Sequence, residues 1–567
     1  MKGLNGPLAV LAGLLSGWVV AIPPVAAADT NGTLLPGVSA RTTRDAPARP
    51  DGVPADAALE AAGARIGAIR ITPRDIFDTS RPEENTALFR LANRLHIGTR
   101  PSTIETQLLF GSGDAFDARR LHETERILRD TRYLNDAWIT PVAYRDGVVD
   151  LEVTTKDVWT LNPGLSFGRK GGENSSGFEI EELNLLGRGS RLSVGRRSGL
   201  DRTSTTFIYR DRQLGRSWWS LDAQYSDNSD GVAKLLAVDH DFHALDARWA
   251  TGASFSDDDR FDSRYDLGEK VGEYRTRARL AGIYGGWSEG LTEGHVLRWR
   301  YGAVLDERRF SAVPGTALPT PIPPDRKLVY PWISAEWLED DFREARNRDQ
   351  IERTEDFQYG WRARGRLGFA DPAFGADRRS LLFSADLGRG IEIGPRETVL
   401  LTASLAGRHE DGDFVDAIVG GSARYYRRQS ERRLAFAEFS FEAGHNLDAD
   451  RQIMIGGDSG LRGYPLRYQA GEGRWLLTLE QRAFSNWFPF RLFNVGGAAF
   501  IDVGGAWGDN PWGTNTRKVL SDVGIGLRLG NNRSALGNVL HIDLAFPLNG
   551  DPSIDKVQLL IETRRSF

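Results

Sequence analysis

Cysteine is absent from the 567 residues of this chain. Its absence excludes disulfides, thiol catalysis, zinc sites built on cysteine and a lipid anchor on an amino-terminal cysteine. A series of long apolar segments is also missing, because 26% of the residues are charged and the mean hydropathy is negative. This excludes a polytopic helical membrane protein. The net charge of −5 argues against a nucleic-acid-binding protein.

Glycine and aromatic residues are plentiful, with 63 glycines and an aromatic content of 10%. This combination is typical of transmembrane β-barrels. Their strands alternate apolar residues that face lipid with polar residues that face the lumen, so their average composition resembles that of a soluble protein. Composition therefore leaves a membrane barrel open while excluding a helical one.

The amino terminus has the pattern of an export signal. Lys2 precedes an apolar run at residues 8–22, and small residues follow two prolines and end at Ala28. We expect a signal peptide over residues 1–28, cleaved after Ala28. An uncleaved membrane anchor is the alternative, but the run is short for a span. Residues 29–62 are rich in Pro, Ala, Gly, Arg, Asp and Thr without an apolar period, which predicts a disordered leader.

Residues 63–160 have the pattern of a small α+β domain. A strand is expected at residues 66–71, helical spacing follows from Leu88 to Leu109, and a second helix is expected near residues 118–131. Two strands at 137–144 and 148–158 are joined by an Arg-Asp-Gly turn. In the second helix Leu121, Ile127 and Leu128 are expected to face the core. Its charged residues are expected to face water: Arg119, Arg120, Glu123, Arg126, Arg129 and Asp130.

The element order of this region resembles that of a POTRA domain. The segments at 113–117, before the second helix, and 132–134, after it, add to the resemblance. We find one such domain and no repeat. The resemblance implies a periplasmic location for residues 63–160.

From residue 161 to residue 567 the sequence contains strand-length segments separated by Gly, Asp, Asn and Pro. Arg275, Arg277 and Arg279 alternate with apolar residues, and the same alternation occurs around Arg298 and Arg364. A soluble sandwich with arginines in water is the alternative interpretation. Because this region is long enough for about 16 strands, we expect a transmembrane antiparallel β-barrel, with arginines such as Arg277, Arg298 and Arg364 facing the lumen.

Three sequence blocks point to a functional loop. The block at 456–464 contains Leu461, Arg462, Gly463 and Tyr464, and blocks around Glu480 and Asp502 follow it. Together they resemble the Omp85 superfamily, which includes the bacterial surface antigen D15 proteins. That resemblance implies a loop folded into the lumen, with Arg462 at its tip and Glu480 and Asp502 as its partners.

Strand alternation places the two carboxylates independently of this resemblance. Leu479 neighbours Glu480, and Ile501 and Val503 flank Asp502, so both acids lie on the face opposite to the apolar residues. A planar guanidinium can serve two carboxylates at once, which a lysine cannot do. The block at 182–189 resembles the first hairpin of the same family.

The first and last barrel strands are expected to meet at a weak seam. The first candidate strand, 161–169, contains Pro163, Gly164 and Gly168, and the last strand ends at Phe567. Proline lacks a donor for the strand ladder and glycine adds no packing, so this seam is predicted to be a lateral gate. An incoming strand could pair with its open edge by β-augmentation.

The resemblance implies a factor for assembly and insertion of proteins in the bacterial outer membrane, and not an enzyme. We expect no cofactor and no metal. The expected partners are outer-membrane lipid, unfolded β-barrel or secreted polypeptide clients, and a periplasmic or inner-membrane accessory protein. Two alternatives remain: a polypeptide-secretion transporter of the two-partner type, and a passive pore or surface antigen. A Gly-Asp-Ser-Gly segment at 457–460 lacks the partner residues of a serine protease.

Overall fold

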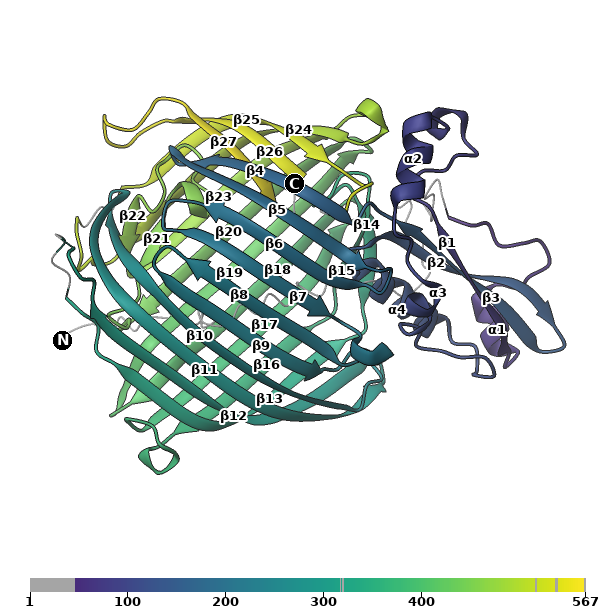
Figure 1. The fold of residues 1–567 in the computed structure, drawn as a ribbon, viewed down its shortest axis with the longest axis horizontal. Coiled ribbons are helices and arrows are strands. Elements are labelled where there is room, and N and C mark those ends of the chain that lie inside the picture. The colour runs from purple at the N-terminus through teal and green to yellow at the C-terminus, as the bar shows by residue number, and fades with distance from the viewer. Residues whose placement is uncertain (1–45, 317, 319–320, 515–517, 536–538, 565–567) are drawn as a thin grey trace.

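The computed structural model describes residues 46–567 except 317, 319–320, 515–517, 536–538 and 565–567. The predicted signal peptide, residues 1–28, and Phe567 lie outside the described residues. A small α+β domain stands at one end of a large barrel, and the elements of the two parts follow each other in the chain (Figure 1).

The small domain has a three-stranded sheet with helices around it. Its elements are α1 (Asp56–Ala61), β1 (Arg65–Arg74), η1 (Pro82–Glu84), α2 (Ala87–Leu95), α3 (Pro101–Glu105), α4 (Ala118–Asp130), β2 (Leu134–Arg145) and β3 (Val148–Asp157). β3 lies in the middle, parallel to β1 and antiparallel to β2. Ile66, Leu121 and Leu151 belong to one buried core. Among the described residues, no helix is both long enough and apolar enough to cross a membrane.

The folded domain begins earlier than the predicted boundary at residue 63. Within the expected disordered leader of residues 29–62, the structure has helix α1, and Leu59 of this helix is fully buried in the domain core. A helix this short is stabilised by tertiary packing rather than by its own pattern. One apolar side chain in a stretch rich in Pro and Ala gave no periodic signal in the sequence.

Helix α4 differs from its prediction on its charged face. Leu121 and Leu128 are buried as expected, but Glu123, Arg126 and Arg129 are buried as well. These three side chains face the barrel, which covers them, so the prediction that they face water was wrong. A single amphipathic helix shows which side is apolar, but the sequence does not show that a second surface will contact its polar side.

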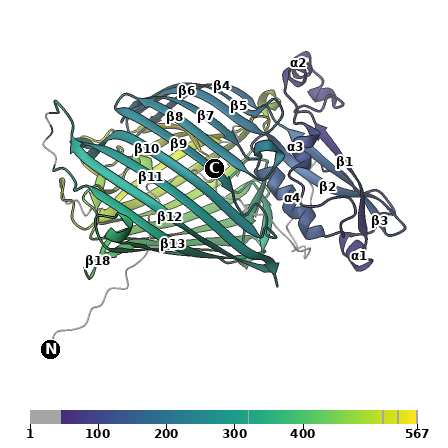
Figure 2. The same cartoon turned by 60° about the horizontal axis from the view of Figure 1, so that its bottom comes forward.

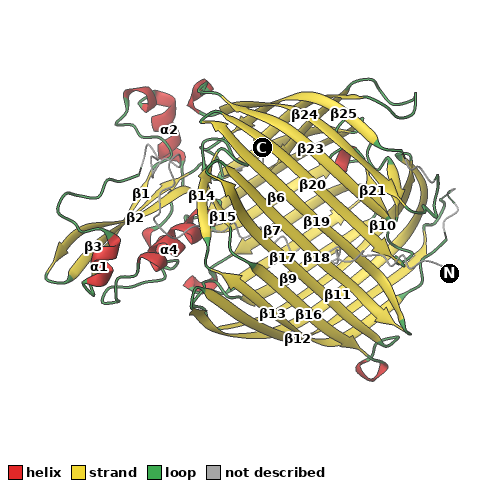
Figure 3. Ribbon diagram, turned by 180° about the vertical axis from the view of Figure 1, so that it is seen from behind, coloured by secondary structure: helices red, strands yellow, loops and turns green. Residues whose placement is uncertain are grey.

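The second part is a closed antiparallel barrel of twenty strands (Figures 1 and 3). They are β4 (Leu161–Lys170), β5 (Glu173–Leu185), β6 (Ser190–Ser198), β7 (Thr203–Asp211), β8 (Ser220–Asn228), β9 (Gly231–His240), β10 (Trp249–Asp266), β11 (Glu269–Thr292), β12 (His295–Ala312), β13 (Arg326–Glu339), β16 (Arg362–Ala370), β17 (Ser380–Gly394), β18 (Glu397–Glu410), β19 (Asp413–Ser430), β20 (Arg433–His445), β23 (Gly473–Phe484), β24 (Asn494–Trp507), β25 (Leu520–Gly530), β26 (Val539–Pro547) and β27 (Gln558–Arg564).

The expected number of about 16 strands was too low. Many hairpins turn over two residues, for example 171–172, 267–268 and 411–412, so each strand uses less of the chain than a strand with an average loop. Short elements lie in three of the longer connections: η2 (Leu214–Arg216), η3 (Pro372–Phe374) and η5 (Pro489–Arg491). The strands tilt against the barrel axis, and the small domain covers one mouth (Figure 2).

The two walls of the barrel follow strand alternation, with one correction. Ile283 and Trp287 of β11 are exposed on the outer wall. Arg277, at the same parity along an unbroken stretch of β11 pairing, therefore lies on the outer wall and not in the lumen. Arg275 and Arg279 share its face. β11 has 24 residues, more than a membrane crossing needs, so its outer face becomes charged where the strand leaves the apolar band. Arg298 and Arg364 do face the lumen, where both lie near Glu336.

Candidate functional site

A loop between β20 and β23 folds into the lumen from the end opposite to the small domain (Figure 1). It contains β21 (Ile453–Ile455), η4 (Gly457–Ser459) and β22 (Gln469–Gly471), and β21 pairs with β22. Leu461 and Tyr464 of this loop are fully buried in an apolar cluster that includes Leu520 of β25. The loop is thus packed against the inner wall.

Arg462 stands at the loop tip and contacts both predicted acids. Its Nε and Nη2 donate to the two carboxylate oxygens of Asp502 at 2.7 and 2.9 Å. Its Nη1 donates to Oε1 of Glu480 at 2.8 Å. The guanidinium carbon lies 3.4 Å from the ring centroid of Phe500. Arg462 is 2% exposed, so this cation is removed from water and held by charge-assisted bonds and a cation–π contact.

Four neighbouring strands each provide an inward carboxylate to this tip. Besides Glu480 on β23 and Asp502 on β24, Asp522 on β25 accepts from the Gly463 amide at 3.0 Å. Asp543 on β26 lies 3.7 Å from Nη1 of Arg462 and also pairs with Arg528. The loop tip is therefore fixed to four of the twenty wall strands and not to two strands alone.

Sequence reasoning missed Asp522 and Asp543, although a signal for both was present. Asp522 alternates with outward-facing Val523 and Ile525, and Asp543 alternates with outward-facing Leu544 in the same way. The pattern that placed Glu480 and Asp502 inward applies equally to these two acids. Phe500 carried no such signal, because an aromatic residue on an inward face is unusual for a polar lumen.

Gly463 and Tyr464 complete the anchoring of the loop. A Cβ on Gly463 would lie 2.6 Å from the Cβ of Asp522, so only glycine permits this approach. The Tyr464 hydroxyl donates to the carbonyl oxygen of Ser521 at 2.8 Å and accepts from the Ser521 amide at 3.1 Å. Gly463 and Tyr464 thus position the backbone that follows the tip.

The seam between β27 and β4 is the weakest junction of the barrel. Within the described residues, one residue pair joins the two strands, Ile561 with Arg169. All other neighbouring barrel strands are joined by seven or more pairs, as the shortest ladders, β13 with β16 and β26 with β27, show. A salt bridge of 2.9 Å between Lys170 and Glu562 adds one contact on the lumenal side.

The predicted seam residues lie where the sequence placed them on β4. Pro163 and Gly164 pair with β5 through Ile180 and Glu179, and β27 offers them no ladder partner among the described residues. A Cβ on Gly168 would lie 3.3 Å from the carbonyl oxygen of Ile561, so glycine permits close approach of the two strands. Phe567, the fourth predicted seam residue, is outside the described part of the chain.

A second loop enters the lumen from the mouth that the small domain covers. It connects β13 to β16 and contains the hairpin of β14 (Phe342–Arg346) and β15 (Thr354–Gln358). Ile351 at its turn is 1% exposed. It packs in a cluster with seven residues that come from six barrel strands. These residues are Leu400, Tyr426, Leu434, Phe436, Phe484, Ala498 and Val539. We call residues 340–361 the lumenal hairpin. Nothing in the sequence separated its strands from the barrel strands.

Polar contacts connect the lumenal hairpin to the loop tip. Arg482 donates through Nε to Glu480 at 2.9 Å and through Nη1 to the carbonyl oxygen of Arg348 at 2.7 Å. Glu480 is also a partner of Arg462, so Arg482 bridges the two loops. Glu355 accepts hydrogen bonds from the backbone amides of the hairpin turn, including that of Arg348 at 2.9 Å. The lumen is therefore occupied from both ends.

Helix α4 of the small domain contacts the outer side of the lumenal hairpin. Arg126 lies over the ring of Phe342 at 4.1 Å. The Thr354 hydroxyl donates to Asp136 at 2.9 Å. Burial raises the pKa of Asp136 to about 6, while nearby Arg129 acts in the opposite direction. The domain and the hairpin thus share a buried polar interface.

The block at 182–189 comprises the end of β5 and the turn to β6, and it contacts the small domain. The Arg100 amide donates to the carbonyl oxygen of Gly187 at 3.1 Å, and the Thr103 hydroxyl donates to the same oxygen at 2.8 Å. Gly187 has a φ of 73°, and a Cβ there would lie 2.5 Å from the carbonyl oxygen of Gly98. Glycine is needed here for a close approach between the two parts of the protein.

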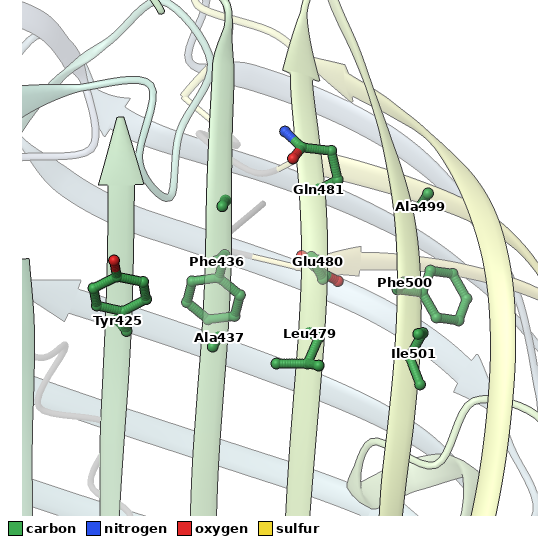
Figure 4. Close-up of a pocket in the computed structure, with 10 residues that line it drawn as sticks. Tyr425, Phe436, Ala437, Leu479, Glu480, Gln481, Ala499, Phe500 and Ile501 are labelled. Carbon is green, nitrogen blue, oxygen red and sulfur yellow. The ribbon is translucent and has the colours of Figure 1, made fainter. Parts of the chain in front are cut away.

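A separate depression of about 500 Å³ lies on the outer wall across β19, β20, β23 and β24 (Figure 4). Its outward side chains are small at Ala435, Ala437 and Ala499, with Tyr425 and Leu479 beside them. Its lining also includes Glu480 and Phe500, which contact Arg462 of the lumenal loop. The described residues hold no group of three or more His, Cys, Asp or Glu side chains suited to a metal ion.

Comparisons with known proteins give similarity to solved outer-membrane barrels. BamA from Haemophilus ducreyi lacking POTRA domains 1–3 is 13% identical, with 88% of this chain and 83% of that chain covered and a TM-score of 0.36. CdiB from Acinetobacter baumannii is 12% identical over 88% and 74%, with a TM-score of 0.44. CdiB from Escherichia coli is 12% identical over 89% and 77%, with a TM-score of 0.45. No family model and no curated protein matches the sequence.

Proposed function

We propose that this protein is an outer-membrane barrel of the Omp85 type that inserts client barrel proteins into the membrane by strand pairing at its seam. The observation that carries the proposal is the seam between β27 and β4, which one described residue pair joins. A closed barrel without such a function gains stability by completing this ladder. In this barrel the ladder comprises a single pair within the described residues.

An open strand edge at membrane depth has a physical consequence. Backbone amide and carbonyl groups that find no partner in hydrocarbon cost several kcal/mol each. Next to the Arg169 pair, Ser166, Phe167 and Gly168 of β4 stand opposite described residues of β27 and have no ladder partner there. A client strand would supply those partners by β-augmentation, and burial of its apolar side chains in lipid would add to the driving force. Neither a nucleotide nor a metal is required.

The small domain is suited to receive clients before insertion. We take the small domain, which begins with α1, as a POTRA-like domain in the periplasm, and its element order and three-stranded sheet support this. β2 lies at one edge of that sheet and could pair with an extended client or with an accessory protein. The chain runs from β3, the middle strand of this sheet, directly into β4. The sheet that would receive a client therefore lies next to the seam.

The occupied lumen favours insertion over a passive pore. Arg462 enters from one end and Ile351 from the other, and both are buried among inward-facing wall residues. A pore would need both loops to leave. A two-partner secretion transporter would also need to clear this path for an extended polypeptide, whereas insertion at the seam leaves it in place.

The test is a disulfide across the seam. Because the chain has no cysteine, Arg169→Cys with Ile561→Cys introduces the only two thiols. We expect the oxidised protein, reconstituted in liposomes, to lose insertion of an unfolded barrel client, and reduction to restore it. Insertion is measured by the heat-modifiability and protease resistance of the client.

The matched control is Thr402→Cys with Ser422→Cys, a facing pair on β18 and β19 whose hydroxyls lie 2.7 Å apart. Oxidation of this pair should leave insertion unchanged. Equal insertion by the oxidised and reduced seam variant would refute the proposal. Client accumulation inside the vesicles, rather than in their membrane, would favour secretion instead.

A further inference from the structure

The outer wall carries a row of alternating charges across five neighbouring strands. Successive registers join Lys234 of β9, Asp257 of β10, Arg279 of β11, Glu307 of β12 and Lys327 of β13. Arg279 contacts Asp257 at 3.4 Å. Opposite charges that face each other on adjacent strands stabilise a sheet. We call these five residues the charged row.

On each of these strands, the outward-facing residue two positions closer to the small domain is apolar. They are Leu236, Phe255, Ala281, Leu305 and Val329, joined by the same registers. Leu236 and Phe255 are exposed on this wall. The change from apolar to charged therefore occurs within one step along five strands, which marks a border of the lipid-facing band.

Aromatic residues mark the other border. Trp287 of β11 pairs with Trp249 of β10 and Trp299 of β12, and all three are exposed on the outer wall. The distance from Trp287 to Arg279 along a tilted strand gives a height of roughly 20 Å across the membrane. An apolar band of about 25 Å between two borders is typical of membrane barrels. The charged row thus lies at the lipid headgroups of the leaflet away from the small domain.

The side chains beyond the charged row add an excess of positive charge. The next register joins Asp259, Arg277 and Arg309, and Arg275 follows on β11. Arg275 binds both oxygens of Asp259 at 2.7 and 2.6 Å. Together with the charged row, these four residues form a surface that contains six basic and three acidic side chains. The acids hold the guanidinium groups in place without balancing their charge.

We propose that this surface binds the phosphate groups of an anionic lipid in that leaflet. Guanidinium groups match phosphate oxygens in pairs, and Arg309 has a side chain that is 64% exposed and able to reach them. Basic side chains at a headgroup border attract anionic lipid. The inference rests on the proposed membrane location but not on client insertion.

The experiment uses the full chain in phosphatidylcholine nanodiscs with and without lipid A, a glycolipid with two phosphates. Bound lipid is counted by native mass spectrometry for the wild type and for a variant that combines Arg277→Gln, Arg279→Gln and Arg309→Gln. We expect lipid A to bind the wild type and to bind this variant at least about tenfold more weakly, because the variant lacks three basic side chains that attract anionic headgroups. Salt should weaken binding to the wild type.

The matched control is Arg427→Gln on the outer wall of β19. Arg427 is also exposed and also paired, with Glu397 at 3.2 Å, but it lies near the opposite border. This variant should bind lipid A as the wild type does. Equal binding by the triple variant, with heat-modifiability showing that it is folded, would overturn the inference. If the triple variant fails to fold, Arg309→Gln alone must reduce binding for the inference to stand. A chain that fails to enter nanodiscs contradicts the membrane location instead.

Discussion

Arg129 of α4 donates two parallel hydrogen bonds to the carboxylate of Asp356 in the lumenal hairpin, from Nε at 2.9 Å and from Nη2 at 2.7 Å. Both side chains are buried, and Nη2 of Arg129 also lies 3.0 Å from Glu344 on the other hairpin strand. The small domain therefore contacts the element that fills the nearby mouth of the barrel. Movement of the domain and exit of the hairpin from the lumen should be coupled through this pair.

Replacing Arg129 should open the lumen. Arg129→Gln leaves the buried carboxylate of Asp356 without this cation, and loss of one partner of a buried pair costs about 3 to 5 kcal/mol. We expect more frequent and larger conductance steps in planar bilayers than for the wild type. Arg120→Gln on the same helix is the control, because Arg120 is half-exposed and its ion pairs are long. Equal conductance of Arg129→Gln and wild type would contradict the coupling.

The loop tip should require an arginine and not merely a positive charge. Arg462→Lys keeps the charge but cannot donate to Asp502 and Glu480 together in the observed geometry. We expect both Arg462→Lys and Arg462→Ala to lower the temperature of heat-modifiable unfolding, with the larger decrease for alanine. Gel mobility of unheated and heated samples measures this. A lysine variant as stable as the wild type would show that simultaneous binding of two carboxylates by the guanidinium is unimportant.

A methyl group at position 463 should displace the loop. Gly463→Ala places Cβ within 2.6 Å of Asp522, so either the loop backbone or the β25 wall must move. Overpacking of this kind costs about 1 to 3 kcal/mol. Gly365→Ala on β16 is the matched control, because a Cβ there meets nothing within 4 Å. Limited proteolysis of the loop should be faster in the first variant only, and equal rates would argue against tight docking.

Titration of Asp136 should make the folded protein less stable as pH rises. Burial raises the pKa of Asp136 from 3.8 to about 6. A raised folded pKa means that the folded state favours the protonated carboxyl relative to the unfolded chain, so this contribution to stability is complete below pH 3.8 and is lost as pH rises through about 6. The free energy of unfolding of the full chain, measured by chemical denaturation, should therefore fall over this interval. Asp136→Asn should remove that part of the pH dependence, and an unchanged profile would contradict the assignment.

Alternation along single strands pointed to the barrel class and to the inward face of the two acids, whereas the resemblance to the Omp85 superfamily implied that Arg462 meets them. Glu480 and Asp502 could be placed on the inner wall by alternation, and Arg462 was found to reach them. The face of Arg277 could not be predicted, since alternation separates two faces but does not say which one meets lipid. That decision depends on where the strand leaves the membrane.

The other features that the sequence did not predict depend on contacts between residues far apart in the chain. Arg129 and Glu123 lie on a helix whose pattern predicts exposure, and their partners are distant in the chain at Asp356 and Leu245. Ile351 occurs in a polar segment that resembles an ordinary turn, although it fills a lumenal cluster. Such residues show their role only when the closed barrel brings distant strands around them.

The short connection between the small domain and the barrel has a mechanical consequence. β3 ends at Asp157 and β4 begins at Leu161, and between them Trp159 is held by backbone bonds to Arg533 and Ala535 of the loop after β25. A rotation of the domain cannot be absorbed by so few tethered residues. Such a rotation would act directly on β4, whose ladder with β27 is the shortest among the described residues, so under the proposed function a client bound at the domain would strain the seam.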